Sequence, residues 1–142
     1  MVELAASGQK SPVFLKDIAI NQEISEKYLS RIVVELKTAG FLESFRGSHG
    51  GYTLARSPKE ITVRQIVAAL EGDLSPVDCV KAGGKCKRMA MCATQDVWRV
   101  LGEAINNALE SITLAQLVAS KLEKVQAGQN CKTLKWAAGF GL

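Results

Sequence analysis

The chain has 142 residues, of which 47% are hydrophobic and only three are proline, so it is neither a low-complexity nor a proline-rich segment. We expect one soluble domain with a helical appendage. No apolar run approaches the roughly 18 residues of a membrane span, and the N-terminal residues lack the regions of a signal peptide, so we expect a cytoplasmic protein. A net charge of +4 permits nucleic-acid binding without requiring it.

Helical signals come first along the chain. Residues 1–7 look like the end of a helix, and a short helix is expected at 15–20. Ser25 is a good N-cap for a longer helix that runs to about Ala39, where Gly40 takes the position beyond its end.

A β-hairpin is expected next. Two strand-like runs, 41–46 and 52–55, are joined by a glycine-rich tip at 47–51. A short helix, a turn, a longer helix and a hairpin in this order predict a winged helix-turn-helix, whose second helix enters the major groove of DNA. The expected fold class is therefore mainly α, with a small β-hairpin wing and a long dimerisation helix.

The second half of the chain is expected to be helical around a loop. Thr62 is a candidate N-cap for a helix that Gly72 ends, and a long amphipathic helix begins at Thr94. Its apolar residues recur at spacings of three and four, which is typical of a helix–helix seam. The expected seam consists of Trp98, Leu101, Ile105, Ala108 and Ile112.

These elements divide the chain into four parts. We expect a DNA-binding domain at 1–72, a cysteine-containing sensor loop at 73–93, the dimerisation helix with a following helix at 94–125, and a partly disordered tail at 126–142.

The candidate DNA contacts lie on the longer helix and on the wing. Hydroxyl and basic groups near the start of the helix can donate to phosphates, and an arginine can reach a guanine. On the wing, an arginine beside bare glycines allows close approach to DNA. A plain solvated helix face is the alternative for the helix, and the wing favours DNA. The residues are Ser25, Lys27, Tyr28, Ser30, Arg31, Arg46, Gly47, Gly50 and Gly51, whereas we assign no role to the exposed loop histidine His49.

Three of the four cysteines cluster in one loop. Cys79, Cys86 and Cys92 fall within fourteen residues, and Cys131 is an incidental tail thiol. Clustered thiols in a reducing compartment indicate a metal or cluster site before a disulfide. The pair Gly83-Gly84 allows the loop to bend. Basic neighbours would offset the charge of a thiolate-ligated cluster and lower the thiol pKa values; these are Lys81, Lys85, Lys87 and Arg88.

Other uses of these thiols compete with a cluster. Structural zinc favours Cys-x-x-Cys, which is absent, whereas a reversible thiol switch suits basic neighbours equally well. The cysteines are without function in the third alternative. An enzyme is not expected, because the sequence has no Cys-x-x-Cys, no clustered Cys/His pair, no glycine-rich phosphate loop and no carboxylate dyad.

Six runs carry a resemblance to a known family: LKDIA at 15–19, ISEKYL at 24–29, RGSHGGYTLA at 46–55, EITV at 60–63, ALEG at 69–72 and ITL at 112–114. Over roughly residues 2–122 they are similar to the Rrf-type winged helix-turn-helix transcription regulators, which include IscR, NsrR and CymR. The resemblance implies a cytoplasmic homodimeric repressor that reads a palindromic double-stranded DNA operator. It implies neither a membrane nor a small-molecule substrate.

The resemblance also bears on the cysteines. Cluster-binding members of the family carry three cysteines in this loop, which favours an iron–sulfur cluster on Cys79, Cys86 and Cys92, [2Fe–2S] rather than [4Fe–4S], that senses iron, redox state or nitric oxide. Gln95 stands where a fourth ligand, histidine, is implied, so Asp78, Asp96, Glu3 and solvent are the alternatives. A cluster-free regulator controlled by a thiol switch or a protein partner is the competing function.

Two departures from the family pattern have structural consequences. Glu23 replaces the usual glycine of the helix-turn-helix turn, so we expect mild strain or a negative charge near DNA. The family's first helix starts several turns earlier, so we expect Met1 to correspond to an internal position of that helix.

Overall fold

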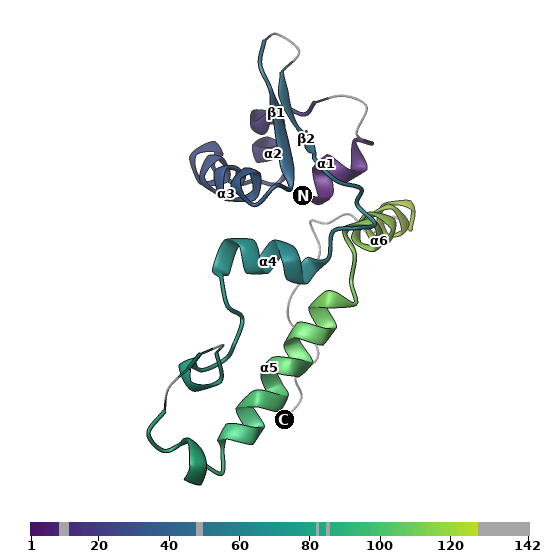
Figure 1. Ribbon diagram of the computed structural model, residues 1–142. Helices are drawn as coiled ribbons and strands as arrows, with labels where there is room; N and C mark the ends of the chain where they lie inside the picture. Colours follow the sequence, from purple (N-terminus) through teal and green to yellow (C-terminus); the bar gives the residue numbers. More distant parts are fainter. Residues whose placement is uncertain (9–11, 48–49, 82, 85, 128–142) are drawn as a thin grey trace.

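The structure is a computed structural model that describes residues 1–8, 12–47, 50–81, 83–84 and 86–127 (Figure 1). It is mainly helical with a two-stranded antiparallel hairpin, which confirms the expected fold class. The first half comprises α1 (Val2–Ala6), α2 (Leu15–Asn21), α3 (Glu26–Thr38), β1 (Leu42–Phe45) and β2 (Gly51–Leu54). The second half comprises α4 (Val63–Glu71), the 3-10 turns η1 (Asp78–Val80) and η2 (Met89–Met91), α5 (Gln95–Glu110) and α6 (Leu114–Gln126).

The core joins the helix-turn-helix to the hairpin and to the start of α6. The predicted inward positions of α2 and α3 are buried, and Ile61 and Leu114 are completely buried where the two halves of the chain meet. The buried core residues are Leu4, Ile18, Ala19, Leu29, Val33, Leu36, Phe41, Leu42, Leu54, Ile61 and Leu114. We use the word "reader" for the unit formed by α1, α2, α3, β1 and β2.

Local capping explains where α3 and α4 begin and end. The Ser25 side chain accepts a hydrogen bond from the Tyr28 N–H at 3.2 Å, which confirms the predicted N-cap. Thr62 and Gln65 form a reciprocal capping box at the start of α4. At the other end of α4, Gly72 has a φ of 78°, a backbone conformation that favours glycine.

The hairpin is held against the segment before α2. Leu42 pairs with Leu54 and Phe45 pairs with Gly51 across the two strands. Val13 exchanges two backbone hydrogen bonds with Tyr52, at 3.0 and 2.9 Å, so the outer side of β2 is also paired. The base of the wing is therefore a small three-segment sheet whose register is fixed on both sides of β2.

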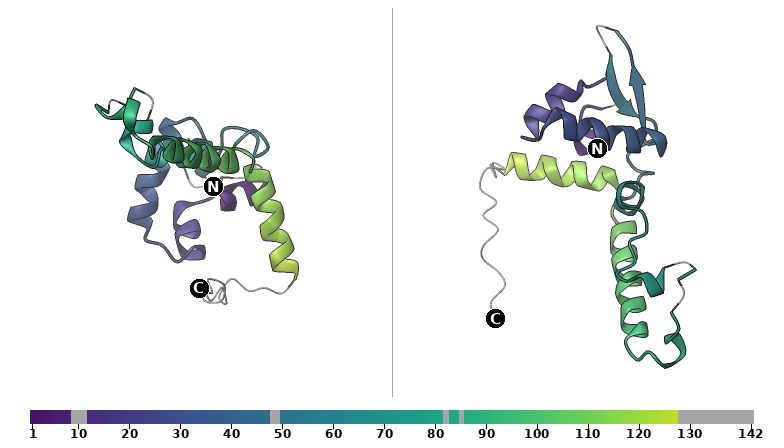
Figure 2. Two further views of the ribbon diagram at one scale, coloured as in Figure 1. Left: turned by 90° about the horizontal axis from the view of Figure 1, so that it is seen from below. Right: turned by 90° about the vertical axis from the view of Figure 1, so that its left-hand side faces the viewer.

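α5 projects away from the reader and carries the cysteine loop at its far end, whereas α6 returns to lie beside α1 (Figures 1 and 2). The expected seam ran through Ile112 in one helix, but α5 ends at Glu110. Ile112 lies in the link to α6, because its carbonyl accepts the Val63 N–H at 2.8 Å. None of the described helices is long and apolar enough to cross a membrane.

Most of the apolar side chains of α5 are uncovered in the single chain. Gly102 is the one buried residue of this helix. Its larger apolar residues are more than a third exposed: Val97 63%, Trp98 38%, Val100 56%, Leu101 43% and Ile105 37%.

Candidate DNA-reading surface and cysteine loop

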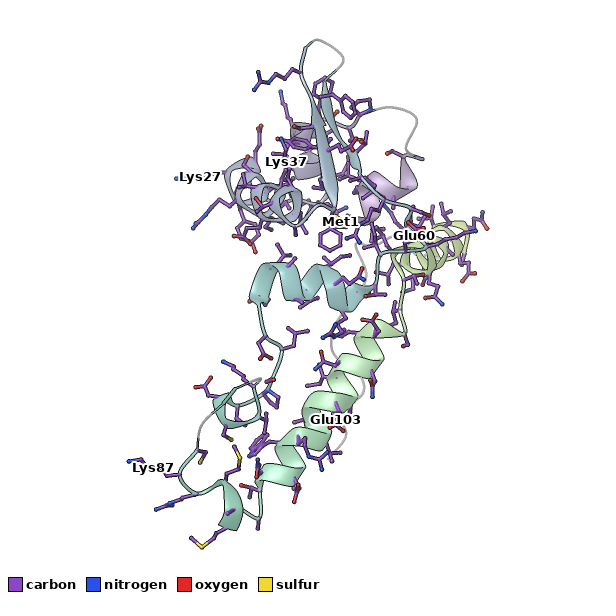
Figure 3. The ribbon with its side chains drawn as sticks, in the orientation of Figure 1. Met1, Lys27, Lys37, Glu60, Lys87 and Glu103 are labelled. Atoms are coloured by element: carbon purple, nitrogen blue, oxygen red, sulfur yellow. The ribbon has the colours of Figure 1, made fainter. Side chains whose placement is uncertain are left out.

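The predicted DNA-contacting side chains of α3 share its exposed side. Lys27, Tyr28, Ser30 and Arg31 lie opposite the buried stripe, and the label in Figure 3 shows Lys27 pointing outward. Ser30 donates its hydroxyl hydrogen to the Glu26 carbonyl at 2.8 Å, so in this state it offers DNA only its oxygen lone pairs. The two basic side chains and the tyrosine are therefore the stronger candidate donors.

The wing presents Arg46 directly after β1, and its side chain is exposed. Gly47 adopts a φ of 102°. A Cβ on Gly50 would lie 2.6 Å from the Phe45 carbonyl oxygen, and one on Gly51 would lie 2.6 Å from the Val13 carbonyl oxygen. The hairpin itself thus requires both glycines, so the close approach to DNA that they suggested stays a prediction. His49 lies outside the described residues.

A side-chain contact connects the longer helix to the wing. The Lys37 Nζ donates to the Ser44 Oγ at 2.5 Å, which joins the last turn of α3 to the middle of β1. Periodicity places Lys37 on the exposed side of α3 and gives no sign of this contact. Because α3 and the wing would address the same DNA duplex, this bond constrains their relative placement.

The turn before α3 is strained and is tied to both ends of the chain. Glu23 has a φ of 53° and is the one described non-glycine residue with a positive φ, which confirms the expected strain. The Gln22 side-chain amide donates to Glu3 Oε1 at 2.8 Å, and Lys121 of α6 also pairs with this carboxylate. Glu3 is therefore engaged beside the reader, at the end of α5 away from the cysteine loop of the same chain (Figure 1).

The three loop cysteines are half-buried and are not in disulfides. Cys79 lies in η1, which packs on α5, while Cys86 precedes η2 and Cys92 follows it. Across the described part of the chain, no three His, Cys, Asp or Glu side chains form a group that could hold a metal ion. Cys131 lies outside the described residues.

Cys92 has the most distinctive environment in the loop. It lines an open hollow of ≈ 520 Å³ together with Arg88, Met91, Ala93 and Thr94. The Thr94 hydroxyl, 3.3 Å from the Cys92 sulfur, lowers the pKa of this thiol, and the backbone N–H groups of Thr94 and Gln95 at the start of α5 lower it further.

The cause of this shift differs from the expected one, which was the basic neighbours. Lys81 instead pairs with Asp78 at 2.5 Å, and Lys85 lies outside the described residues. Lys87 points outward from the loop (Figure 3), so it belongs to the solvent-facing edge. The start of a helix, rather than a cluster of cations, makes Cys92 more acidic than an ordinary cysteine.

The carboxylates considered as a fourth ligand already have partners. Asp78 accepts from Lys81, and Asp96 accepts from Arg99 at 3.4 Å. Gln95 occupies the first position of α5. Recruiting either carboxylate as a ligand would therefore break an existing ion pair.

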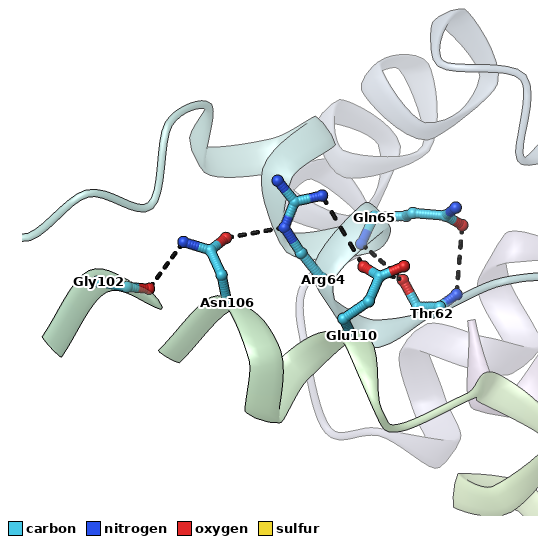
Figure 4. Close-up of polar contacts among 6 residues, drawn as sticks. All are labelled: Thr62, Arg64, Gln65, Gly102, Asn106 and Glu110. Atoms are coloured by element: carbon cyan, nitrogen blue, oxygen red, sulfur yellow. Dashed lines mark hydrogen bonds and ion pairs between the residues drawn. The ribbon is translucent and has the colours of Figure 1, made fainter. Parts of the chain in front are cut away.

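Both stems of the cysteine loop are linked by polar side chains that sequence reasoning missed (Figure 4). Arg64 of α4 donates through Nε to the Asn106 Oδ1 at 2.8 Å and lies 3.8 Å from the Glu110 carboxylate. The Thr62 hydroxyl donates to the same carboxylate at 3.2 Å. These residues are 42–48 positions apart in the sequence, so no local pattern indicates that they meet.

Comparison with known proteins gives consistent results. The sequence model of the Rrf2 family, described as an iron-dependent transcriptional regulator, matches residues 1–120. Protein rrf2 of Nitratidesulfovibrio vulgaris (strain Hildenborough) is 40% identical over 118 residues, which cover 83% of this chain and 79% of that protein.

Two solved structures share the fold and more than 30% of the aligned sequence. The first is CymR, the global cysteine regulator of B. subtilis, with a TM-score of 0.72 and 34% identity over 84% of this chain and 87% of the other. The second is IscR of T. potens, with a TM-score of 0.68 and 33% identity over 98% of this chain and 85% of the other.

Proposed function

The chain belongs to the Rrf2 family of transcriptional regulators and is thus a DNA-binding regulator, and from this membership we propose that it acts as a homodimeric repressor that senses through an iron–sulfur cluster. The proposed signal is iron, redox state or nitric oxide. The observation that carries the sensing part is the position of the three thiols, in one loop whose two stems, α4 and α5, are joined to each other and to the reader.

The proposed DNA contacts follow from the exposed groups of α3 and the wing. Lys27 and Arg31 would address the major groove, and Arg46 would address the backbone or the minor groove. The uncovered apolar side of α5 supports a second copy of the chain as the dimer partner, because a contiguous apolar surface of this kind marks an interaction site. Two readers related by a twofold axis then match a palindromic operator.

The donor chemistry of the loop fits an iron–sulfur cluster. Three half-buried thiols outside disulfides are the soft donors that such clusters use. Cys79, Cys86 and Cys92 would hold the cluster, which when bound supplies reversible electron transfer and sensitivity to oxidants. Since the described residues form no ready three-ligand group, ligation requires the loop to bring these side chains together. This requirement would couple the occupancy of the loop to its conformation.

A cluster-free thiol switch is the second candidate, and the environment of Cys92 favours it. A thiol with a lowered pKa at an open hollow is more often a thiolate, the form that oxidants attack. This alternative keeps the DNA reader and assigns sensing to reversible oxidation of Cys92 or to a protein partner.

The first experiment measures the absorption spectrum, iron and acid-labile sulfide of the chain purified without oxygen. We expect visible absorbance with matching iron and sulfide, lost in Cys79→Ala, Cys86→Ala and Cys92→Ala and kept in the matched control Cys131→Ala. Colourless, iron-free protein under these conditions would reject the cluster and leave the thiol switch.

The second experiment tests DNA reading with duplexes selected by the protein from a random pool. Affinity should fall steeply as salt rises, and Arg46→Ala should reduce the slope of log affinity against log salt by about one. Arg99→Ala is the matched control, because Arg99 bonds only Asp96 and Glu103 of its own helix among its printed contacts. An unchanged slope in Arg46→Ala would remove this residue from the DNA surface.

A further inference from the structure

A continuous series of contacts runs along α5 from the cysteine loop toward the reader (Figure 4). At the loop end, Gly102 packs so closely under Pro76 that a Cβ on it would lie 3.2 Å from the proline Cδ. One turn further, the Asn106 side chain donates to the Gly102 carbonyl at 2.8 Å and accepts from Arg64 Nε at 2.8 Å. Both the donor and the acceptor of this amide are therefore used, which fixes its orientation.

The series continues from Arg64 to the junction between the reader and α6. The Glu110 carboxylate lies 3.8 Å from Arg64 Nη1 and accepts from the Thr62 hydroxyl at 3.2 Å. Thr62 caps α4, and it is bridged across the chain to Thr113, which caps α6. The same carboxylate thus contacts α4 at its first residues and the arginine within its first turn.

The geometry fixes the register of α4 on α5. Asn106 and Glu110 are four residues apart and share one side of α5, and the planar guanidinium of Arg64 spans both of them. A slide of α4 by one helical turn would break both contacts together. The Arg64 and Glu110 side chains are 46% and 50% exposed, so the pair adds little to folding stability. Its main consequence is therefore orientation.

We propose that Arg64 and Asn106 are positioning residues that hold α4 in one register on α5 and thereby set the separation of the two readers in the dimer. α4 leads directly from the reader, whereas α5 carries the apolar side that we assign to the dimer. A change in the angle between these helices displaces each reader relative to its partner. The proposal rests on the DNA-binding homodimer of the proposed function and is independent of what the cysteine loop holds.

The test measures how strongly the dimer discriminates between half-site separations. The probes are duplexes selected by the wild-type protein, the same duplexes with the two halves moved apart or together by one base pair, and a single half-site. We expect Arg64→Ala and Asn106→Ala to reduce the ratio of Kd values between altered and selected separations by roughly threefold or more, with unchanged half-site binding. The double variant should match either single variant, because both residues act through one contact.

Matched controls separate positioning from general damage. Arg99→Ala removes an arginine that bonds only within α5 among its printed contacts, and Asn107→Ala removes the neighbouring asparagine, so both should keep the wild-type ratio. Wild-type discrimination in Arg64→Ala and Asn106→Ala, or an equal loss of half-site binding and dimer binding, would overturn the proposal. A wild-type protein that selects no duplex would count against the proposed function itself, and against this proposal with it.

Discussion

Glu23 stores backbone strain at the turn that precedes the recognition helix. Its φ of 53° lies in the left-handed region, where a side chain costs about 1–2 kcal/mol. Glycine removes that cost but loses more conformational entropy on folding, by about 0.5–1 kcal/mol. We therefore expect Glu23→Gly to raise the free energy of unfolding by about 0.5–1 kcal/mol, measured by denaturant unfolding at fixed protein concentration.

The control for this prediction keeps the Cβ atom. Glu23→Ala removes the carboxylate but retains the strained conformation, so its stability should stay near that of the wild type. If alanine stabilised the chain as much as glycine does, the negative charge rather than the backbone would be responsible.

Cys92 should be the loop thiol whose reactivity depends on a threonine hydroxyl. Because its pKa is lowered, more of it is thiolate at neutral pH, and its alkylation rate should level off at a lower pH than for an ordinary cysteine. Thr94→Val removes the largest cause and should move the pH profile upward, whereas Thr94→Ser should leave it in place. Iodoacetamide labelling of the iron-free chain at a series of pH values, read by mass spectrometry, measures this. Identical profiles for valine and serine would contradict the assigned cause.

At the scale of the element, the hairpin depends on Gly51 for reasons internal to the fold. Its φ is 133°, and a Cβ would meet the Val13 carbonyl oxygen, so Gly51→Ala combines backbone strain with displacement of a paired segment. We expect a loss of about 2–4 kcal/mol in the free energy of unfolding. Gly40 has a φ of 75° with nothing within 4 Å of its Cβ position, so Gly40→Ala should cost only about 1 kcal/mol.

The alternative for Gly51 is a role at the DNA surface alone. In that case Gly51→Ala would keep its stability while its affinity for selected duplexes fell. Thermal unfolding and fluorescence anisotropy on the same preparation separate these two outcomes.

The helices and the hairpin were predictable because their signals are local. Ser25, Thr62 and Gly72 cap helices with atoms a few residues away, and the apolar period of α3 matches its buried stripe. The end of α5 was not predictable in this way. Ile112 fits the apolar spacing of the helix, but its carbonyl bonds to Val63 of a distant segment, and that tertiary contact ends the regular pattern.

For the candidate site, the sequence indicates which residues matter more readily than how they are placed. Spacing brings Cys79, Cys86 and Cys92 into one loop, and the structure leaves them half-buried there. The lowered pKa of Cys92 depends on the helix start and on Thr94, and the Arg64 contacts join residues more than 40 positions apart. Neither arrangement has a short-range signature, because each depends on how α4 and α5 pack.

At the scale of the whole molecule, α5 needs a partner to cover its apolar side. Trp98, Leu101 and Ile105 follow one another at helical spacing and are 37–43% exposed in the single chain. A second copy of α5 would bury them, and a carboxylate placed there would be desolvated without a partner. We therefore expect Leu101→Asp to convert a dimer into a monomer, measured by sedimentation velocity.

The matched control places the same carboxylate on an apolar residue outside α5. Ile20 is 64% exposed on α2, within the reader, so Ile20→Asp should sediment as the wild type does. The Leu101→Asp monomer should keep its affinity for a single half-site and lose the additional affinity for two, because joined readers gain from effective concentration. A dimeric Leu101→Asp would place the interface elsewhere, and the separation of the readers would then no longer follow from the angle between α4 and α5.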